Sequence, residues 1–94
     1  MPRRKKTTTP EATAYRAVLN VLGKNHEGTG ATARDAIANI VAKNCKGRGV
    51  LTVTHGDKTK ERILLPHLTF RLCNTYGLMR EIALKNTSLL FEGL

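Results

Sequence analysis

The stretch HEGTGATARD, which ends at Asp35, constrains the fold most, because it combines two glycines with a helix start signal. Gly28 and Gly30 interrupt regular structure, since glycine gives up the most conformational freedom inside a helix or strand. Thr32, followed three residues later by Asp35, forms a variant of the capping box, in which side chains satisfy the free N–H groups of the first turn. The stretch therefore predicts a break and then a helix that begins at Ala33.

Apolar residues on both sides of this break follow helical spacing. Before it, Thr9 and Pro10 suit an N-cap and a first helical position. A helix over about Pro10–Lys24 then places four apolar side chains on one face, at Ala14, Val18, Val21 and Leu22. After it, the helix from Ala33 keeps the same spacing at Ala36, Ile37, Ile40, Val41 and Cys45.

The stretch CKGRGVLTVTHGDKTKERILL has two interpretations. In the first, the helix from Ala33 continues, kinked at its glycines, to about His55. In the second, Val50–Thr54 and Arg62–Leu65 are two strands of a hairpin around HGDKTK, which the β-branched residues favour.

The last third of the chain predicts two more helices. Pro66 opens the first, which carries Leu68, Phe70, Leu72 and Cys73 and which Gly77 ends. The second follows with apolar residues at Leu78, Met79, Ile82 and Ala83.

Charge indicates the class of partner. The chain has 16 Lys and Arg against seven Asp and Glu, for a net charge of +9 and a pI near 10.2. Such an excess is typical of proteins that bind a polyanion, most often nucleic acid. Residues 1–8 form a basic arm, predicted to be flexible, with charges at Arg3, Arg4, Lys5 and Lys6. A membrane is not expected as a partner, because no apolar run approaches the roughly 18 residues of a spanning helix, and no signal peptide is expected.

The residues that carry catalysis are scarce. Ser88 is the only serine, and no two carboxylates are paired by local spacing, so we expect neither an enzyme nor a cofactor. The histidines and cysteines lack the spacings of a zinc site, so we expect no metal: these residues are His26, His55, His67, Cys45 and Cys73. Two cysteines in 94 residues suit a reducing compartment.

Two short stretches are candidates for phosphate contact. The glycine-rich stretch is no P-loop, because Thr29 stands where the motif requires Lys. The N–H groups of Thr32, Ala33 and Arg34 at a helix start could still bind phosphate, or form only a capped turn. The second stretch, DKTKER, alternates Lys58, Lys60 and Arg62. No aromatic residue interrupts this stretch, which disfavours a single-strand stacking platform.

The order of short helix, capped loop, longer helix, basic loop and short helix resembles the histone fold. VLNVLGKNHEGTGATAR is similar to the first loop of histone 2B, and YGLMREIALKNTSLL is similar to its extra C-terminal helix. The resemblance spans about residues 14–90. It departs at Gly47 and Gly49, where the family has one glycine, and at Lys60, where the family has the Arg that enters the minor groove. Such departures are typical of a divergent histone, as from a viral or reduced genome.

The resemblance implies an all-α histone fold over residues 9–94, with an additional C-terminal helix from about residue 77. It also implies pairing with a histone 2A-like chain and other core histones, and packaging of duplex DNA by sequence-tolerant backbone and minor-groove contacts. The location would be the nucleus and chromosome, or a viral factory and virion, with no membrane and no small-molecule substrate. The residues expected to touch DNA are Arg3, Arg4, Lys5, Lys6, Thr32, Ala33, Arg34, Lys58, Lys60 and Arg62.

Two other functions stay open. A monomeric winged-helix-like protein would use the hairpin at residues 50–65 as its wing and read one preferred DNA sequence. A basic structural protein of a ribonucleoprotein or virion would prefer structured RNA over duplex DNA.

Overall fold

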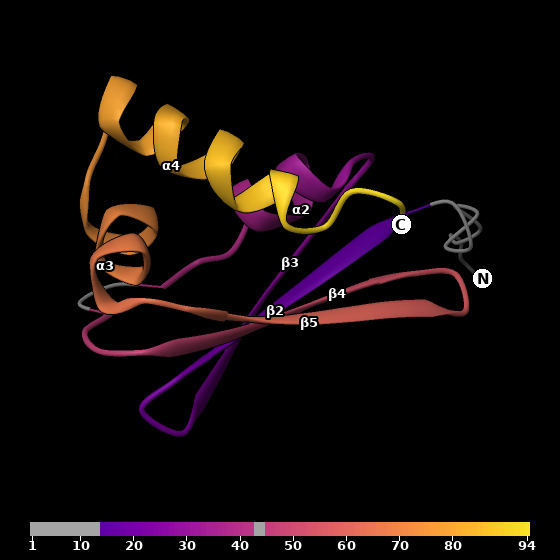
Figure 1. The fold of residues 1–94 in the computed structure, drawn as a ribbon, viewed down its shortest axis with the longest axis horizontal. Coiled ribbons are helices and arrows are strands. Elements are labelled where there is room, and N and C mark those ends of the chain that lie inside the picture. The colour runs from indigo at the N-terminus through magenta and orange to yellow at the C-terminus, as the bar shows by residue number, and fades with distance from the viewer. Residues whose placement is uncertain (1–13, 43–44) are drawn as a thin grey trace, which may run out of the picture.

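The computed structural model describes residues 14–42 and 45–94, which form two β-hairpins and three helices (Figure 1). The basic arm at residues 1–8, including Arg3, Arg4, Lys5 and Lys6, lies outside the described residues. In chain order the elements are β2 (Tyr15–Val21), β3 (Lys24–Gly30), α2 (Ala33–Ala38), β4 (Gly49–His55), β5 (Lys58–Leu64), α3 (Pro66–Asn74) and α4 (Leu78–Leu89).

The four strands form one antiparallel sheet in the order β3-β2-β4-β5. A two-residue turn closes each hairpin. In the turn between β2 and β3, both Leu22 and Gly23 have positive φ, and in the turn between β4 and β5 Gly56 does. Positive φ at these positions matches the right-handed twist of the flanking strands. The two hairpins meet where β2 pairs with β4 along their whole length.

The sheet contradicts the predicted all-α histone fold. The predicted helix over Pro10–Lys24 is wrong where the structure describes it, because β2 and β3 occupy this part of the chain. Ala14, Val18, Val21 and Leu22 do have helical spacing, but Ala17, Leu19 and Val21 lie at alternate positions, between residues that are less buried. In the folded chain these three residues are buried. Burial of every second residue is the pattern of a strand.

The helix predicted to start at Ala33 is confirmed at its beginning and wrong in its length. Thr32 is the N-cap, and its hydroxyl accepts a 3.0 Å hydrogen bond from the Asp35 amide. The helix ends after six residues at Ala38, rather than continuing to His55. The alternative hairpin is confirmed, with longer strands than predicted, because β-branched residues from Val50 onward favour a pleated strand. The two helices after Pro66 are confirmed as α3 and α4.

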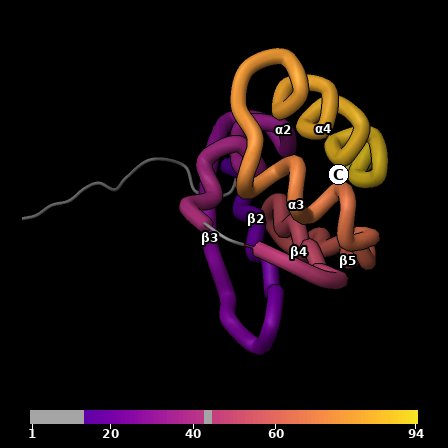
Figure 2. Tube along the Cα trace, turned by 90° about the vertical axis from the view of Figure 1, so that its left-hand side faces the viewer, coloured from indigo at the N-terminus to yellow at the C-terminus, as the bar shows by residue number. Residues whose placement is uncertain are grey.

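One face of the sheet packs against all three described helices, and this interface holds the core. The sheet contributes buried side chains from alternate positions: Ala17, Leu19, Val21, Leu51, Val53 and Leu64. The helices and the end of the chain contribute Ala36, Ile37, Leu72, Ala83, Leu84 and Phe91. Figure 1 shows α2 and α4 together above the sheet, and Figure 2 shows the same pair from the side. The opposite face, here called the open face, carries no helix among the described residues.

The two glycines of HEGTGATARD allow α2 to lie directly on β3. A Cβ added at Gly28 would sit 2.3 Å from the Ala36 carbonyl oxygen and 2.5 Å from the Ile40 amide nitrogen. A Cβ at Gly30 would sit 2.6 Å from the Asp35 Cβ. Real Cβ atoms do not approach other atoms so closely, so any other residue at these positions would push the helix away from the strand.

Replacing Gly28 by Ala should therefore destabilise the protein. We expect the free energy of unfolding to fall by about 1–3 kcal/mol, the usual cost of overpacking a core. Urea denaturation followed by circular dichroism measures this change. Thr29→Ala is the control, because Thr29 is exposed on the same strand, and it should shift the midpoint far less. Equal midpoints for the two variants would show that α2 does not need the glycine.

Candidate nucleic-acid interface

The acidic residues are distributed unevenly along the chain. No Asp or Glu occurs in residues 36–56 or in residues 62–80. These two stretches nevertheless contain six cations, at Lys43, Lys46, Arg48, Arg62, Arg71 and Arg80. If the fold brings both stretches together, positive charge accumulates in one place without compensation.

The structure brings these two stretches side by side at α3. The Asn74 side-chain amide, at the end of α3, donates a 3.0 Å hydrogen bond to the Cys45 carbonyl oxygen. Near the start of the helix, Gly49 abuts Thr69, whose hydroxyl oxygen would lie 3.1 Å from a Cβ at Gly49. Residues 45–49 therefore run alongside α3 in the opposite direction, with Lys46 and Arg48 between the two contacts.

The outer surface of α3 continues this basic region. Leu72 and Thr69 of this helix are buried, whereas His67, Phe70 and Arg71 are exposed. We call the exposed set made by the helix and the neighbouring segment the α3 corner: Lys46, Arg48, His67, Phe70 and Arg71. Within the described part of the chain, no carboxylate forms an ion pair with any cation of the corner. Its charge is therefore available to an external anion.

Arg80 holds the corner in place, a role that the sequence did not suggest. Its side chain, on α4, donates a 3.1 Å hydrogen bond to the Leu72 carbonyl oxygen and a 3.0 Å hydrogen bond to the Ala38 carbonyl oxygen. These carbonyls lie at the ends of α3 and α2, where helices leave carbonyl groups unpaired. Arg80 thereby ties three helices together and is not available to a ligand in the way Lys46 and Arg48 are.

The predicted phosphate site at Thr32, Ala33 and Arg34 differs from the α3 corner, because its charge is paired within the protein. The Thr32 hydroxyl already caps Asp35. The Arg34 guanidinium forms an ion pair with Glu81 of α4 and lies 3.9 Å from an Asp35 carboxylate oxygen. Two carboxylates thus offset the positive charge that the sequence assigned to phosphate contact.

The second predicted stretch forms a row on the edge strand β5. Lys58, Lys60 and Arg62 are alternate residues, so they lie on one side of the strand. Lys60 donates a 2.7 Å hydrogen bond to the Glu92 carbonyl oxygen, and Arg62 bonds the neighbouring Glu61 carbonyl oxygen at 2.9 Å. The row and Arg34 lie on different elements, and no ion pair joins them among the described residues.

The open face of the sheet is close to neutral. Arg16 and Glu27 form an ion pair at 2.8 Å across β2 and β3. Asn20 donates to Asn25 at 2.7 Å, and most other side chains of this face are hydroxyl-bearing or β-branched. The open face therefore adds little positive charge, in contrast to the α3 corner and to the row on β5.

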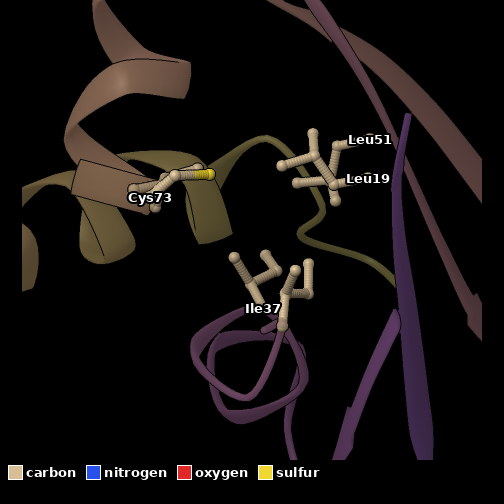
Figure 3. A pocket seen from close by; sticks show the side chains of 6 residues that line it. Leu19, Ile37, Leu51 and Cys73 are labelled. Atoms are coloured by element: carbon tan, nitrogen blue, oxygen red, sulfur yellow. The ribbon is translucent and has the colours of Figure 1, made fainter. Parts of the chain in front are cut away.

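The two cysteines, Cys45 next to Lys46 and Cys73 on α3, are close enough for their side chains to form a hydrogen bond. Both are free thiols, Cys45 buried and Cys73 half-buried. Burial, together with a hydrogen bond with the Cys45 thiol, raises the pKa of the Cys73 thiol from 9.0 to about 12. Cys73 also lines a cavity of about 10 Å³ with Leu19, Ile37 and Leu51, whose side chains point toward one another (Figure 3). This space holds about one water molecule at most.

Comparison of the chain with protein-family models, with curated proteins and with solved structures found no match. Among the described residues, no group of three or more His, Cys, Asp or Glu side chains is arranged to hold a metal ion. None of the described helices has the length and apolar character needed to span a bilayer.

The raised pKa makes the reactivity of Cys73 predictable. Only the thiolate reacts with iodoacetamide, and at about pH 9 the folded Cys73 should still be protonated. Its alkylation rate should keep rising about tenfold per pH unit up to about pH 10.5, whereas the rate in the urea-unfolded chain should level off above pH 9. Peptide mapping by mass spectrometry separates Cys73 from Cys45. A plateau near pH 9 in the folded protein would contradict the assigned shift.

Proposed function

We propose that the protein binds nucleic acid by its phosphate backbone, with the α3 corner as the main contact and little preference for base sequence. The observation that carries the proposal is the meeting of two acid-free stretches at α3, which leaves Lys46, Arg48 and Arg71 exposed and, among the described residues, without a carboxylate partner. Lys and Arg that neutralise phosphates release condensed counterions, and this supplies most of the affinity of sequence-tolerant binding.

The proposal does not include the histone fold or its dimer. Pairing by crossed central helices needs a long second helix, and α2 has six residues. The physical reason for expecting a histone 2A-like partner is therefore gone. The winged-helix alternative loses support for a similar reason, because β4 pairs with β2 as well as with β5. The hairpin is thus half of the central sheet and does not project as a wing.

The ion pairs favour the α3 corner over Arg34 as the place of phosphate contact. Both Arg34 and the corner are exposed to an approaching ligand, but Arg34 faces Glu81 and Asp35. A phosphate that approached Arg34 would lie close to these two carboxylates or would have to displace them. Repulsion between the negative charges disfavours both. The β5 row is intermediate, since Asp57 and Glu61 flank its lysines in sequence.

Salt-dependent binding tests the proposal. Fluorescence anisotropy with a labelled oligonucleotide, measured at several salt concentrations, gives the slope of log K against log salt. Lys46→Ala/Arg48→Ala should weaken binding to all base sequences and reduce the slope by about two, one for each phosphate that is no longer neutralised. Duplex DNA, single-stranded DNA and structured RNA are compared as ligands, since the histone resemblance implies the first and a ribonucleoprotein role implies the last.

The matched control is Lys24→Ala/Lys85→Ala, which removes the same charge from the β2–β3 hairpin and from α4. It should leave the slope nearly unchanged. Equal slopes for the two double variants would mean that net charge alone drives binding and that the α3 corner is no site. If Arg34→Ala lowered the slope more than the corner variant did, the start of α2 would be the contact instead.

A further inference from the structure

Phe70 is an exposed aromatic residue inside the positively charged α3 corner. The chain has four aromatic residues, two Tyr and two Phe. Phe91 is buried, and the ring of Tyr15 stacks on His55 with ring centroids 3.9 Å apart. Phe70 and Tyr76, in contrast, are 47% and 82% exposed, and Phe70 lies on the outside of a helix whose other side meets the core.

The position of Phe70 on α3 places it next to the basic segment. Residues three and four apart on a helix are neighbours, so Phe70 adjoins Cys73 and Asn74. Asn74 bonds the Cys45 carbonyl oxygen, and Thr69, which precedes Phe70, abuts Gly49. Helix positions before and after Phe70 thus contact both ends of the segment that carries Lys46 and Arg48. His67, three residues before Phe70, extends the same outer surface.

An apolar ring beside cations suits an unpaired base joined to phosphates. Aromatic side chains in single-strand binders stack on bases, while neighbouring Lys and Arg follow the backbone. In a duplex the base faces are already stacked on one another, so an exposed ring on a convex helix gains no stacking partner there. The amino-acid sequence disfavoured such a platform because DKTKER contains no aromatic residue. The fold supplies one from a different stretch of the chain.

We infer that the α3 corner binds single-stranded nucleic acid, with Phe70 stacked on a base and Lys46 and Arg48 against the adjoining phosphates. This inference rests on the proposed function and narrows its ligand. Stacking needs only the π face that every base presents, so the preference should be for unpaired strands and not for a base sequence.

The test separates stacking from charge by using two probes with the same number of phosphates. One is a labelled oligothymidylate, and the other is an abasic oligonucleotide of equal length. The wild-type protein should bind the first more tightly, and Phe70→Leu should remove most of that difference, a loss of roughly 5- to 150-fold for one stacked base. Phe70→Tyr keeps a flat ring and should retain the difference. Affinity for the abasic probe should be the same for all three proteins.

A second measurement does not depend on affinity differences. The chain contains no Trp, so Phe70→Trp introduces a single tryptophan at the corner, which can be excited selectively over the two tyrosines. Its fluorescence should be quenched by the oligothymidylate and much less by the abasic probe at equal saturation.

Tyr76→Leu is the control for loss of an exposed ring. Tyr76 is 82% exposed beside Arg80, whose guanidinium is already hydrogen-bonded, and its replacement should leave the probe preference unchanged.

The outcomes separate this inference from the proposed function. If both probes bind equally and Lys46→Ala/Arg48→Ala weakens both, the corner binds phosphates but Phe70 does not stack, and the inference fails alone. If the double variant changes neither probe, or the wild type binds none of the nucleic acids at low salt, the proposed function fails as well. Tighter binding of duplex DNA than of oligothymidylate would also overturn the inference.

Discussion

The pairing of β2 with β4 is the contact on which the rest of the structure depends. Each of the two hairpins closes locally through a two-residue turn, but an isolated hairpin is at best marginally stable in water. The ladder from Tyr15↔His55 to Val21↔Gly49 joins them into a single sheet. Only then do the buried side chains of both hairpins form one continuous surface on which the helices can pack. The neighbouring ladder between β4 and β5, in which Gly49 lies opposite Leu64, brings residues 45–49 to the end of the sheet where α3 begins.

The helices could be predicted from the sequence, because short local patterns decide where they begin. The capped start of α2 at Thr32 and the helix after Pro66 follow from capping and proline chemistry, and the helix after Gly77 follows from its apolar spacing; the structure has all three. The first hairpin was missed because its apolar residues fit both periods. Val18, Val21 and Leu22 suggested a helix face, although the burial of Leu19 between less buried neighbours is what the strand uses. Long-range pairing decided between the two periods, and no local pattern carries that information.

The candidate site divides in the same way. The excess of positive charge could be predicted from composition, but which cations are paired with carboxylates could not. The sequence favoured Arg34 because it adjoins the free N–H groups of a helix start, yet α4 brings the distant Glu81 carboxylate to it. Lys46 and Arg48 do not stand out in the sequence, because they lie among glycines in a stretch of ambiguous structure. Their value as a site comes from α3, which lies beside them and contributes an aromatic ring and another cation, and this juxtaposition exists only in the fold.

The row of cations on β5 also affects how copies of the protein meet one another. β5 is an outer strand of the sheet, and an outer strand presents unpaired backbone groups that invite another chain to add to the sheet. Lysine and arginine side chains repeated along such a strand repel an identical strand, because two copies would bring like charges together. Lys58, Lys60 and Arg62 therefore disfavour edge-to-edge pairing of two copies through β5, whether or not nucleic acid touches them. Salt that screens these charges weakens this protection.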